Sequence, residues 1–213
     1  MNFIKKVYSI LSVQLLMTAV FVTGSCFSDS YKQFIVQNMW FFWVCLVVNI
    51  VLLYVLVYVR SASRKVPVNY FLLGLFTFTE AYLVSCITAY EDPETVFIAA
   101  LLTAAIVVAL TIYAFTTKTD FTICGGLLFT ALMALFVGSI LALIFRSRYL
   151  AIVISALSVV VFSIYLIYDT QLILGKGELK LTIDDYIFAA MNLYLDIIRI
   201  FLEILRLVSA ARN

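Results

Sequence analysis

The chain has 213 residues, of which 65% are hydrophobic and 12% are charged, and its formal net charge is +2. In soluble domains roughly a quarter of the residues are charged, so this composition and the mean hydropathy of +1.14 indicate a membrane protein. No basic run suggests a nucleic-acid surface, and the lack of histidine excludes a Ser-His intramembrane protease and a histidine-ligated zinc hydrolase.

Seven apolar stretches are long enough to cross a bilayer, since a span needs about 20 residues at 1.5 Å rise per residue. They lie near residues 7–27, 39–59, 70–90, 96–115, 121–145, 150–174 and 184–206. The first is too long for the core of a cleaved signal peptide, so we interpret it as an anchor. The breaks are short, and the sequence predicts an all-α integral membrane protein with one transmembrane helical domain over residues 1–213.

Lys and Arg are distributed unevenly between the breaks. Seven spans would put eight of these residues on the N-terminal side of the membrane and five on the opposite side. Basic residues are enriched in cytoplasmic loops, so we expect a cytosolic N-terminus. If the last segment only re-enters the membrane, the end of the chain returns to the cytosol.

Two local patterns mark the boundaries of the last two predicted helices. Gly175 and Gly177 follow an apolar run and give a natural helix stop. Thr182, with Asp185 three residues later, resembles a capping box that opens the last helix. Four widely spaced cysteines show no CxxC pair, and we expect them to be small buried hydrophobes rather than a disulfide frame or metal site: Cys26, Cys45, Cys86 and Cys124.

Three acidic residues fall inside the apolar stretches, namely Glu80, Asp169 and Asp196. Charges are expensive in hydrocarbon, so each is a candidate functional residue. For Glu80 two interpretations stay open: a further carboxylate of an ion pathway, or an interior group hydrogen-bonded near Thr77 or Thr79.

The last stretch carries a polar stripe at spacings of three and four residues, which places its members on one face of a helix. Its members are Asp185, Ala189, Asn192, Asp196, Arg199, Glu203 and Arg206. The stripe either faces the interior of the bundle or is exposed to water on a helix that lies at the membrane surface. Asp196 is either functional or neutralised by Arg199 as a structural pair.

Asp169 and Asp196 lie on neighbouring predicted helices, and a tilt or a cytosolic start of the last helix would let them meet. Two carboxylates within a few ångströms in a poorly solvated site cannot both ionise cheaply, so they share a proton and titrate as a coupled pair. A cation can replace that proton, and Ca²⁺ prefers carboxylate and carbonyl oxygens. Transient Ca²⁺ contact at these two residues is therefore an expectation.

Five segments in order, covering nearly the whole chain, resemble the lifeguard branch of the transmembrane Bax inhibitor motif family. They span residues 3–11, 76–80, 115–122, 168–175 and 185–198. The chain shows no long Pro-rich N-terminal tail and in this is similar to the Golgi anti-apoptotic members. Arg199 and Glu203 add charge where relatives are mostly polar or apolar, and we expect them to modulate Asp196.

The resemblance implies a bundle in which a central seventh helix is wrapped by six others. It implies a pH-sensitive Ca²⁺ leak in Golgi or endoplasmic reticulum membranes and protection against cell death, with no cofactor and with cell-death regulators or calcium-release channels as partners. Asp169 and Asp196 match the family's di-aspartyl pH sensor, with Glu80 and Asn192 as further candidates along the ion pathway. Arg60 matches an arginine that latches the closed state to the first aspartate.

Two other functions were weighed. One is an interaction protein that regulates cell death without intrinsic transport, in which the carboxylates are structural. The other is an intramembrane aspartyl protease, since Tyr168-Asp169 is followed by a second membrane aspartate. The Gly-x-Gly-Asp sequence of such enzymes is missing, because Asp196 follows Leu195. We therefore expect a protein that is not an enzyme.

Overall fold

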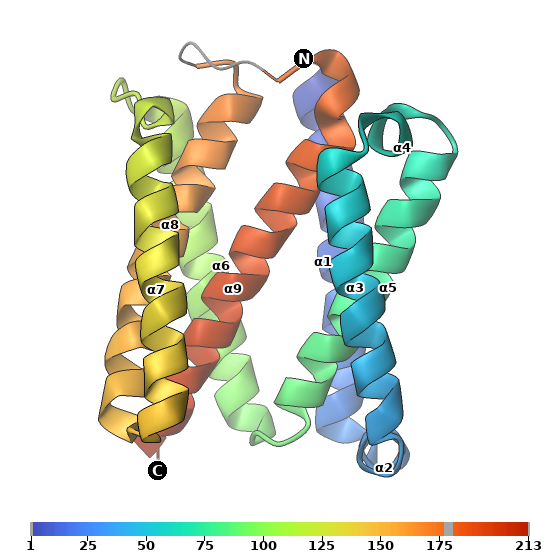
Figure 1. Cartoon of the computed structure of the whole chain (residues 1–213), viewed down its shortest axis with the longest axis vertical. Coiled ribbons are helices and arrows are strands. Elements are labelled where there is room, and N and C mark those ends of the chain that lie inside the picture. The colour runs from blue at the N-terminus through green and yellow to red at the C-terminus, as the bar shows by residue number, and fades with distance from the viewer. Residues whose placement is uncertain (1, 177–180, 213) are drawn as a thin grey trace. The chain divides into compact units, whose positions relative to one another are not determined.

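The computed structural model describes residues 2–176 and 181–212, with only the backbone described at Asn2 and Arg60. The described residues form helices and no strands (Figure 1). Two short 3-10 turns, Thr122–Cys124 and Ile183–Asp185, precede α7 and α9. The helices are α1 (Asn2–Phe27), α2 (Asp29–Gln37), α3 (Met39–Tyr58), α4 (Arg60–Arg64), α5 (Val68–Thr88), α6 (Pro93–Thr116), α7 (Gly125–Phe145), α8 (Arg148–Ile173) and α9 (Tyr186–Arg212).

Within the described residues, six helices are long and apolar enough to cross a membrane: α1, α3, α5, α6, α7 (with the turn before it) and α8. They coincide with the first six predicted spans to within a few residues. The seventh predicted span, 184–206, falls in α9, whose charged residues set it apart from these six. The chain is therefore a multi-pass membrane protein, whereas the arrangement around a central seventh helix stays a prediction.

Two of the predicted breaks contain short helices that the sequence interpretation did not include. Residues 29–37 form α2, which begins after Ser28, whose Oγ accepts a hydrogen bond from the Tyr31 N–H (3.3 Å). Asp29 in the first turn also favours this helix, because its charge faces the positive helix end. Residues 60–64 form the single turn α4.

The described residues divide into two compact units. Unit 1 comprises Met1–Glu94 and Thr182–Tyr194, and unit 2 comprises Thr95–Leu181 and Leu195–Asn213. In unit 1, α5 packs against both α1 and α3, and in unit 2, α7 packs against α8 (Figure 1). The helix α9 contributes its first turns to unit 1 and the remainder to unit 2. That the chain acts as one domain stays a prediction.

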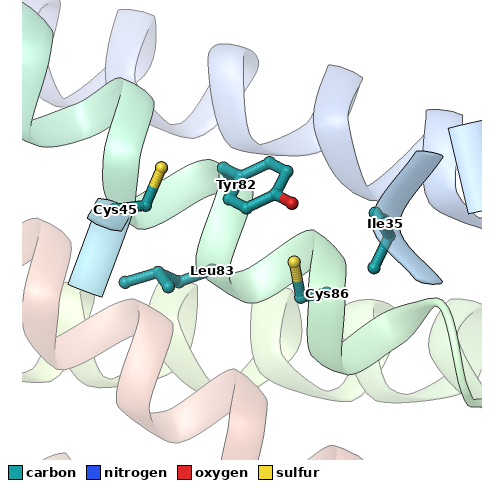
Figure 2. Packing of buried hydrophobic residues seen from close by; sticks show 5 residues of the cluster. All are labelled: Ile35, Cys45, Tyr82, Leu83 and Cys86. Carbon is teal, nitrogen blue, oxygen red and sulfur yellow. The ribbon is translucent and has the colours of Figure 1, made fainter. Parts of the chain in front are cut away.

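The core of unit 1 is built on α5. In its most apolar stretch 67% of the residues are buried, whereas the share is 11% in the corresponding stretch of α7. Where α2, α3 and α5 meet, buried residues cluster around the Tyr82 ring (Figure 2). The Phe41 ring contacts Tyr82 edge-on, with ring centroids 4.8 Å apart. Cys45 and Cys86 belong to this cluster. All four cysteines are free, and three are buried, so the prediction of small buried hydrophobes is confirmed for all but Cys124, which is half-buried.

Both predicted helix boundaries are present. Gly175 has a φ of 69°, and the Lys176 N–H bonds the Gln171 carbonyl (3.0 Å), which closes the end of α8. Gly177 lies outside the described residues. Thr182 and Asp185 form the predicted capping box, with the Thr182 N–H donating to Asp185 Oδ2 (3.0 Å).

Candidate functional site

The carboxyl groups of Asp169 on α8 and Asp196 on α9 lie within hydrogen-bonding reach of each other inside unit 2. Both side chains are buried, with 8% and 7% of their surface exposed. Ionised carboxylates are acceptors only, so a hydrogen bond between the two groups requires that one of them carries a proton. Two carboxyl groups in this arrangement can share one proton, and that they do so stays a prediction.

The pair is incompletely satisfied by its surroundings. Asp196 Oδ2 is buried without a hydrogen-bond partner, as is the neighbouring hydroxyl of Thr170. The ring of Tyr165 lies within electrostatic reach of both carboxyl groups. A buried acceptor without a donor is costly, and a proton or a cation at this oxygen would remove the cost.

The lower part of the polar stripe, from Arg199 to Glu203 and Arg206, does not neutralise Asp196. Among the described residues no ion pair joins Arg199 to Asp196, and Arg199 is exposed. Glu203 instead pairs with Arg206 (3.1 Å). Neutralisation of Asp196 by Arg199 is therefore not what holds Asp196 in place, and modulation by Arg199 and Glu203 stays a prediction. Asn192 is half-buried in the part of α9 that belongs to unit 1.

Glu80 belongs to unit 1 and is buried on α5. It lies within electrostatic reach of Tyr194 on α9, whose hydroxyl shares a 2.8 Å hydrogen bond with the hydroxyl of Thr18 on α1. The flanking threonines are bonded to other helices: Thr77 accepts from Gln14, and Thr79 accepts from Asn49 (both 3.0 Å). Glu80 thus sits among interior polar contacts, and its place in an ion pathway stays a prediction.

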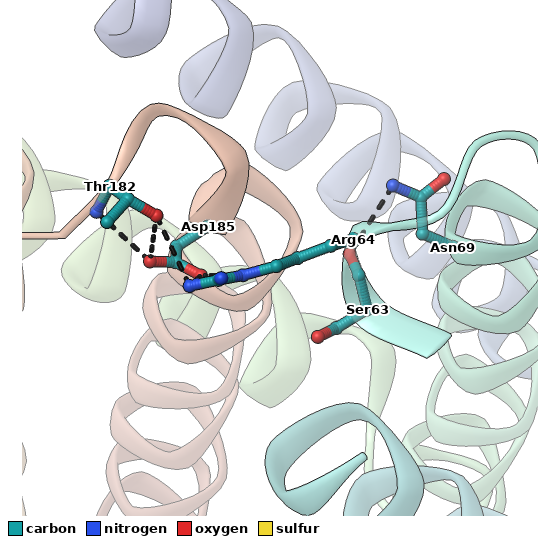
Figure 3. A network of polar contacts seen from close by, with 5 residues as sticks. All are labelled: Ser63, Arg64, Asn69, Thr182 and Asp185. Carbon is teal, nitrogen blue, oxygen red and sulfur yellow. Dashed lines mark hydrogen bonds and ion pairs between the residues drawn. The ribbon is translucent and has the colours of Figure 1, made fainter. Parts of the chain in front are cut away.

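The side chain of Arg60 lies outside the described part of the structure, so its predicted latch has no structural account. Arg64, one turn later, forms an ion pair that the sequence interpretation missed. Its guanidinium contacts Asp185 Oδ1 at 2.8 Å and donates to Thr182 Oγ1 at 3.3 Å (Figure 3). Partial burial alone would raise the pKa of Asp185, but hydrogen bonds from Thr182 and Arg64 outweigh it and lower that pKa.

Further contacts hold the start of α9 within unit 1. Asn69 Nδ2 donates to the Tyr186 hydroxyl (2.9 Å), and the Lys6 ammonium lies 3.3 Å from the centroid of the Tyr186 ring. Together with Arg64 and Asp185 they anchor this helix to α1, α4 and α5. The sequence identified Asp185 as a capping acid but gave no sign of its basic partner Arg64, which lies 121 residues away.

The sequence model of the family described as "Inhibitor of apoptosis-promoting Bax1" matches residues 1–213. The chain belongs to the transmembrane Bax inhibitor motif family. This Bax inhibitor motif protein is 35% identical over 211 residues to human Protein lifeguard 3, covering 97% of the chain and 68% of that protein. Mouse Protein lifeguard 3 is 34% identical over 213 residues, with 98% and 69% covered.

A plant relative extends the comparison. Protein LIFEGUARD 2 of Arabidopsis thaliana is 33% identical over 213 residues, covering 98% of the chain and 87% of that protein. The predicted resemblance to the lifeguard branch is therefore confirmed. The family match spans α8 and α9, so the carboxylate pair lies within the shared region.

Proposed function

We propose that the protein is a pH-sensitive calcium leak channel of Golgi or endoplasmic reticulum membranes that protects cells against apoptosis. The observation that carries this proposal is the buried Asp169–Asp196 pair, whose carboxyl groups lie within hydrogen-bonding reach. The anti-apoptotic part of the proposal is supported by the family's description as an inhibitor of apoptosis-promoting Bax1.

The chemistry of the pair supplies the pH dependence. With one shared proton the pair carries a single negative charge, and the two helices remain together. Loss of that proton leaves two adjacent negative charges in a poorly solvated site, and their repulsion favours separation or occupation by a cation. With histidine absent from the sequence, carboxylates are the groups available for sensing pH near neutrality.

Ca²⁺ enters this proposal as the transported ion. Hard cations prefer oxygen ligands, and the pair offers carboxylate oxygens, including the unpartnered Asp196 Oδ2. Ca²⁺ takes six to eight oxygen ligands when it is firmly bound, and two carboxylates supply at most four. The pair therefore fits transient contact with a passing ion better than a permanent metal site.

A second candidate is an interaction protein that regulates cell death without transport. It is favoured by the family description, which names a protein and no ion. An intramembrane aspartyl protease would also use two aspartates that share a proton, and peptide cleavage by the purified protein tests it.

The deciding experiment measures Ca²⁺ flux by purified protein in liposomes across pH 5 to 8, with protein-free liposomes as the baseline. The channel proposal predicts flux that exceeds the baseline and changes with pH. Asp92→Asn, at an exposed acid in the turn between α5 and α6, is the matched control and should leave the profile unchanged. Flux equal to the baseline at every pH would favour the interaction protein.

A further inference from the structure

Arginines gather at one end of unit 2. The turn between α7 and α8 lies against the last turns of α9, because Arg148 Nη2 donates to the Ala210 carbonyl (3.3 Å) and Arg206 Nη1 donates to Ser155 Oγ (3.2 Å). We call the four arginines of these two segments the arginine cluster: Arg146, Arg148, Arg206 and Arg212.

The arginine cluster carries an excess of positive charge. Glu203, which pairs with Arg206 at 3.1 Å, is the only carboxylate side chain in residues 140–155 and 200–212. Leaving Arg212 aside, three guanidinium groups (Arg146, Arg148 and Arg206) face the one carboxylate of Glu203, which leaves two positive charges in excess. Arg146 and Arg212 lie at the ends of α7 and α9, where the helix dipole favours a cation. Arg148 opens α8, where the dipole disfavours a cation, so an anion here would offset an unfavourable charge.

The cluster is placed at the level of phospholipid headgroups. One membrane-spanning stretch, Thr122–Phe145, ends at this turn, and the next, Arg148–Ile173, begins after it. Phe145 and Tyr149 beside the arginines are 70% and 79% exposed. Exposed aromatic rings are typical of the membrane–water interface, where they lie next to headgroups and the upper acyl chains.

We propose that the arginine cluster binds the headgroup of an anionic phospholipid. The guanidinium fork of Arg146 and Arg148 suits the phosphate oxygens, and Arg206 adds positive charge beside them. Phe145 and Tyr149 contact the apolar part of the same lipid. Each arginine near an anionic membrane surface favours binding several-fold, so a cluster selects anionic over zwitterionic lipid. The site is independent of the carboxylate pair and of any transport activity.

The test titrates the purified full chain in neutral detergent with phosphatidylglycerol or phosphatidylcholine and counts bound lipid by native mass spectrometry. The wild type should prefer phosphatidylglycerol. Arg146→Gln with Arg148→Gln should weaken phosphatidylglycerol binding at least about tenfold and leave phosphatidylcholine binding unchanged. Soluble glycerol phosphate at equal concentration should not displace the lipid; equal competition would identify a soluble phosphate ligand and overturn the lipid proposal.

The matched control is Lys65→Gln with Lys118→Gln, which removes the same charge from exposed side chains outside the cluster. It should bind phosphatidylglycerol like the wild type. Equal weakening in the control, or wild-type affinity in the arginine variant, would overturn the proposal. If the double arginine variant fails to fold, Arg146→Gln alone, at an exposed side chain, should show a loss of about fivefold, and no loss would again overturn it.

Discussion

Units 1 and 2 bury polar side chains in different ways. In unit 1 several buried hydrogen bonds between uncharged side chains join helices, and we call four of them the neutral pairs: Gln14–Thr77, Thr18–Tyr194, Ser25–Thr88 and Asn49–Thr79. In unit 2 one of the buried contacts between α8 and α9 lies between two carboxyl groups. A neutral pair is satisfied at any pH near neutrality, whereas the carboxyl pair depends on a proton.

The buried polar groups of the two units differ in what their chemistry allows: neutral groups can hold helices together, whereas acids can also respond to protons and cations. Hydrogen bonds between transmembrane helices contribute about 0.6 kcal/mol each on average, so the neutral pairs act as modest packing contacts. Unpartnered groups also occur in unit 1, at Gln14 Oε1 and the Tyr82 hydroxyl, but an amide and a phenol stay uncharged near neutral pH. Of these groups only the carboxyl pair is acidic; Glu80, the buried acid of unit 1, lies among neutral contacts.

The largest expected effect comes from placing a carboxylate in a neutral pair. Thr77→Asp puts an acid beside Gln14 in the buried interface of α1 and α5, one helical turn from the buried acid Glu80. We expect a loss of about 3 kcal/mol in the free energy of unfolding, the cost of an acid within a membrane helix. Unfolding in detergent measures it, with Thr77→Val as the uncharged control. Equal stability of the two variants would show that unit 1 tolerates charge as unit 2 does.

Arg60→Ala tests whether a positive charge biases the carboxyl pair. The family resemblance predicts that Arg60 holds the channel closed by bonding Asp169. Because a charge-assisted hydrogen bond of this kind is strong, its removal should change the Ca²⁺ leak at a fixed pH about tenfold. The measurement is the pH profile of Ca²⁺ flux in liposomes. An unchanged profile would instead assign Arg60 as an anchor at the membrane interface.

Gln14→Leu removes one neutral pair without adding charge. The expected loss in the free energy of unfolding is about 0.6 kcal/mol, because one interhelical hydrogen bond is lost and an apolar side chain replaces the amide. The pH profile of flux should stay that of the wild type. A changed pH profile would mean that the neutral pairs take part in gating, and the contrast between the units would fail.

The smallest effect concerns the exposed ion pair of Arg64 with Asp185. Because the pKa of Asp185 is lowered in the folded protein, its stabilising contribution is complete above the unfolded value of about 3.9 and is lost as pH falls through the folded pKa. Arg64→Gln should flatten that acid-side fall in stability and cost about 0.3 kcal/mol at pH 7, since the partners are partly exposed. Melting temperatures of both proteins between pH 3 and 7 test this, and identical curves would contradict it.

How much of the structure the sequence predicts depends on the range of the contacts. The six apolar spans, the Gly175 helix end and the Thr182–Asp185 capping box follow from patterns within a few residues, and all are present. The short helices α2 and α4 were missed, because a run of 5 to 9 residues carries too little periodic signal.

Long-range partners were the other gap. Arg64 and Asp185, or Gln14 and Thr77, are joined by tertiary packing that no local pattern records. Asp169 and Asp196 of the candidate site could be found from the sequence, because acids within apolar stretches carry a high free-energy cost. The same argument singled out Glu80, and sequence reasoning alone could not separate an acid that faces a second acid from one placed among neutral contacts.

The measurement that tests the central claim most directly is the pH profile of Ca²⁺ flux in liposomes for Asp169→Asn, Asp196→Asn and the double variant. Each single change leaves one carboxyl group beside a neutral amide, so no proton is shared between two acids. We predict that both single variants lose most of the pH dependence between pH 6 and 8, and that the double variant loses no more. Wild-type pH profiles in both single variants would contradict the coupled-carboxylate account.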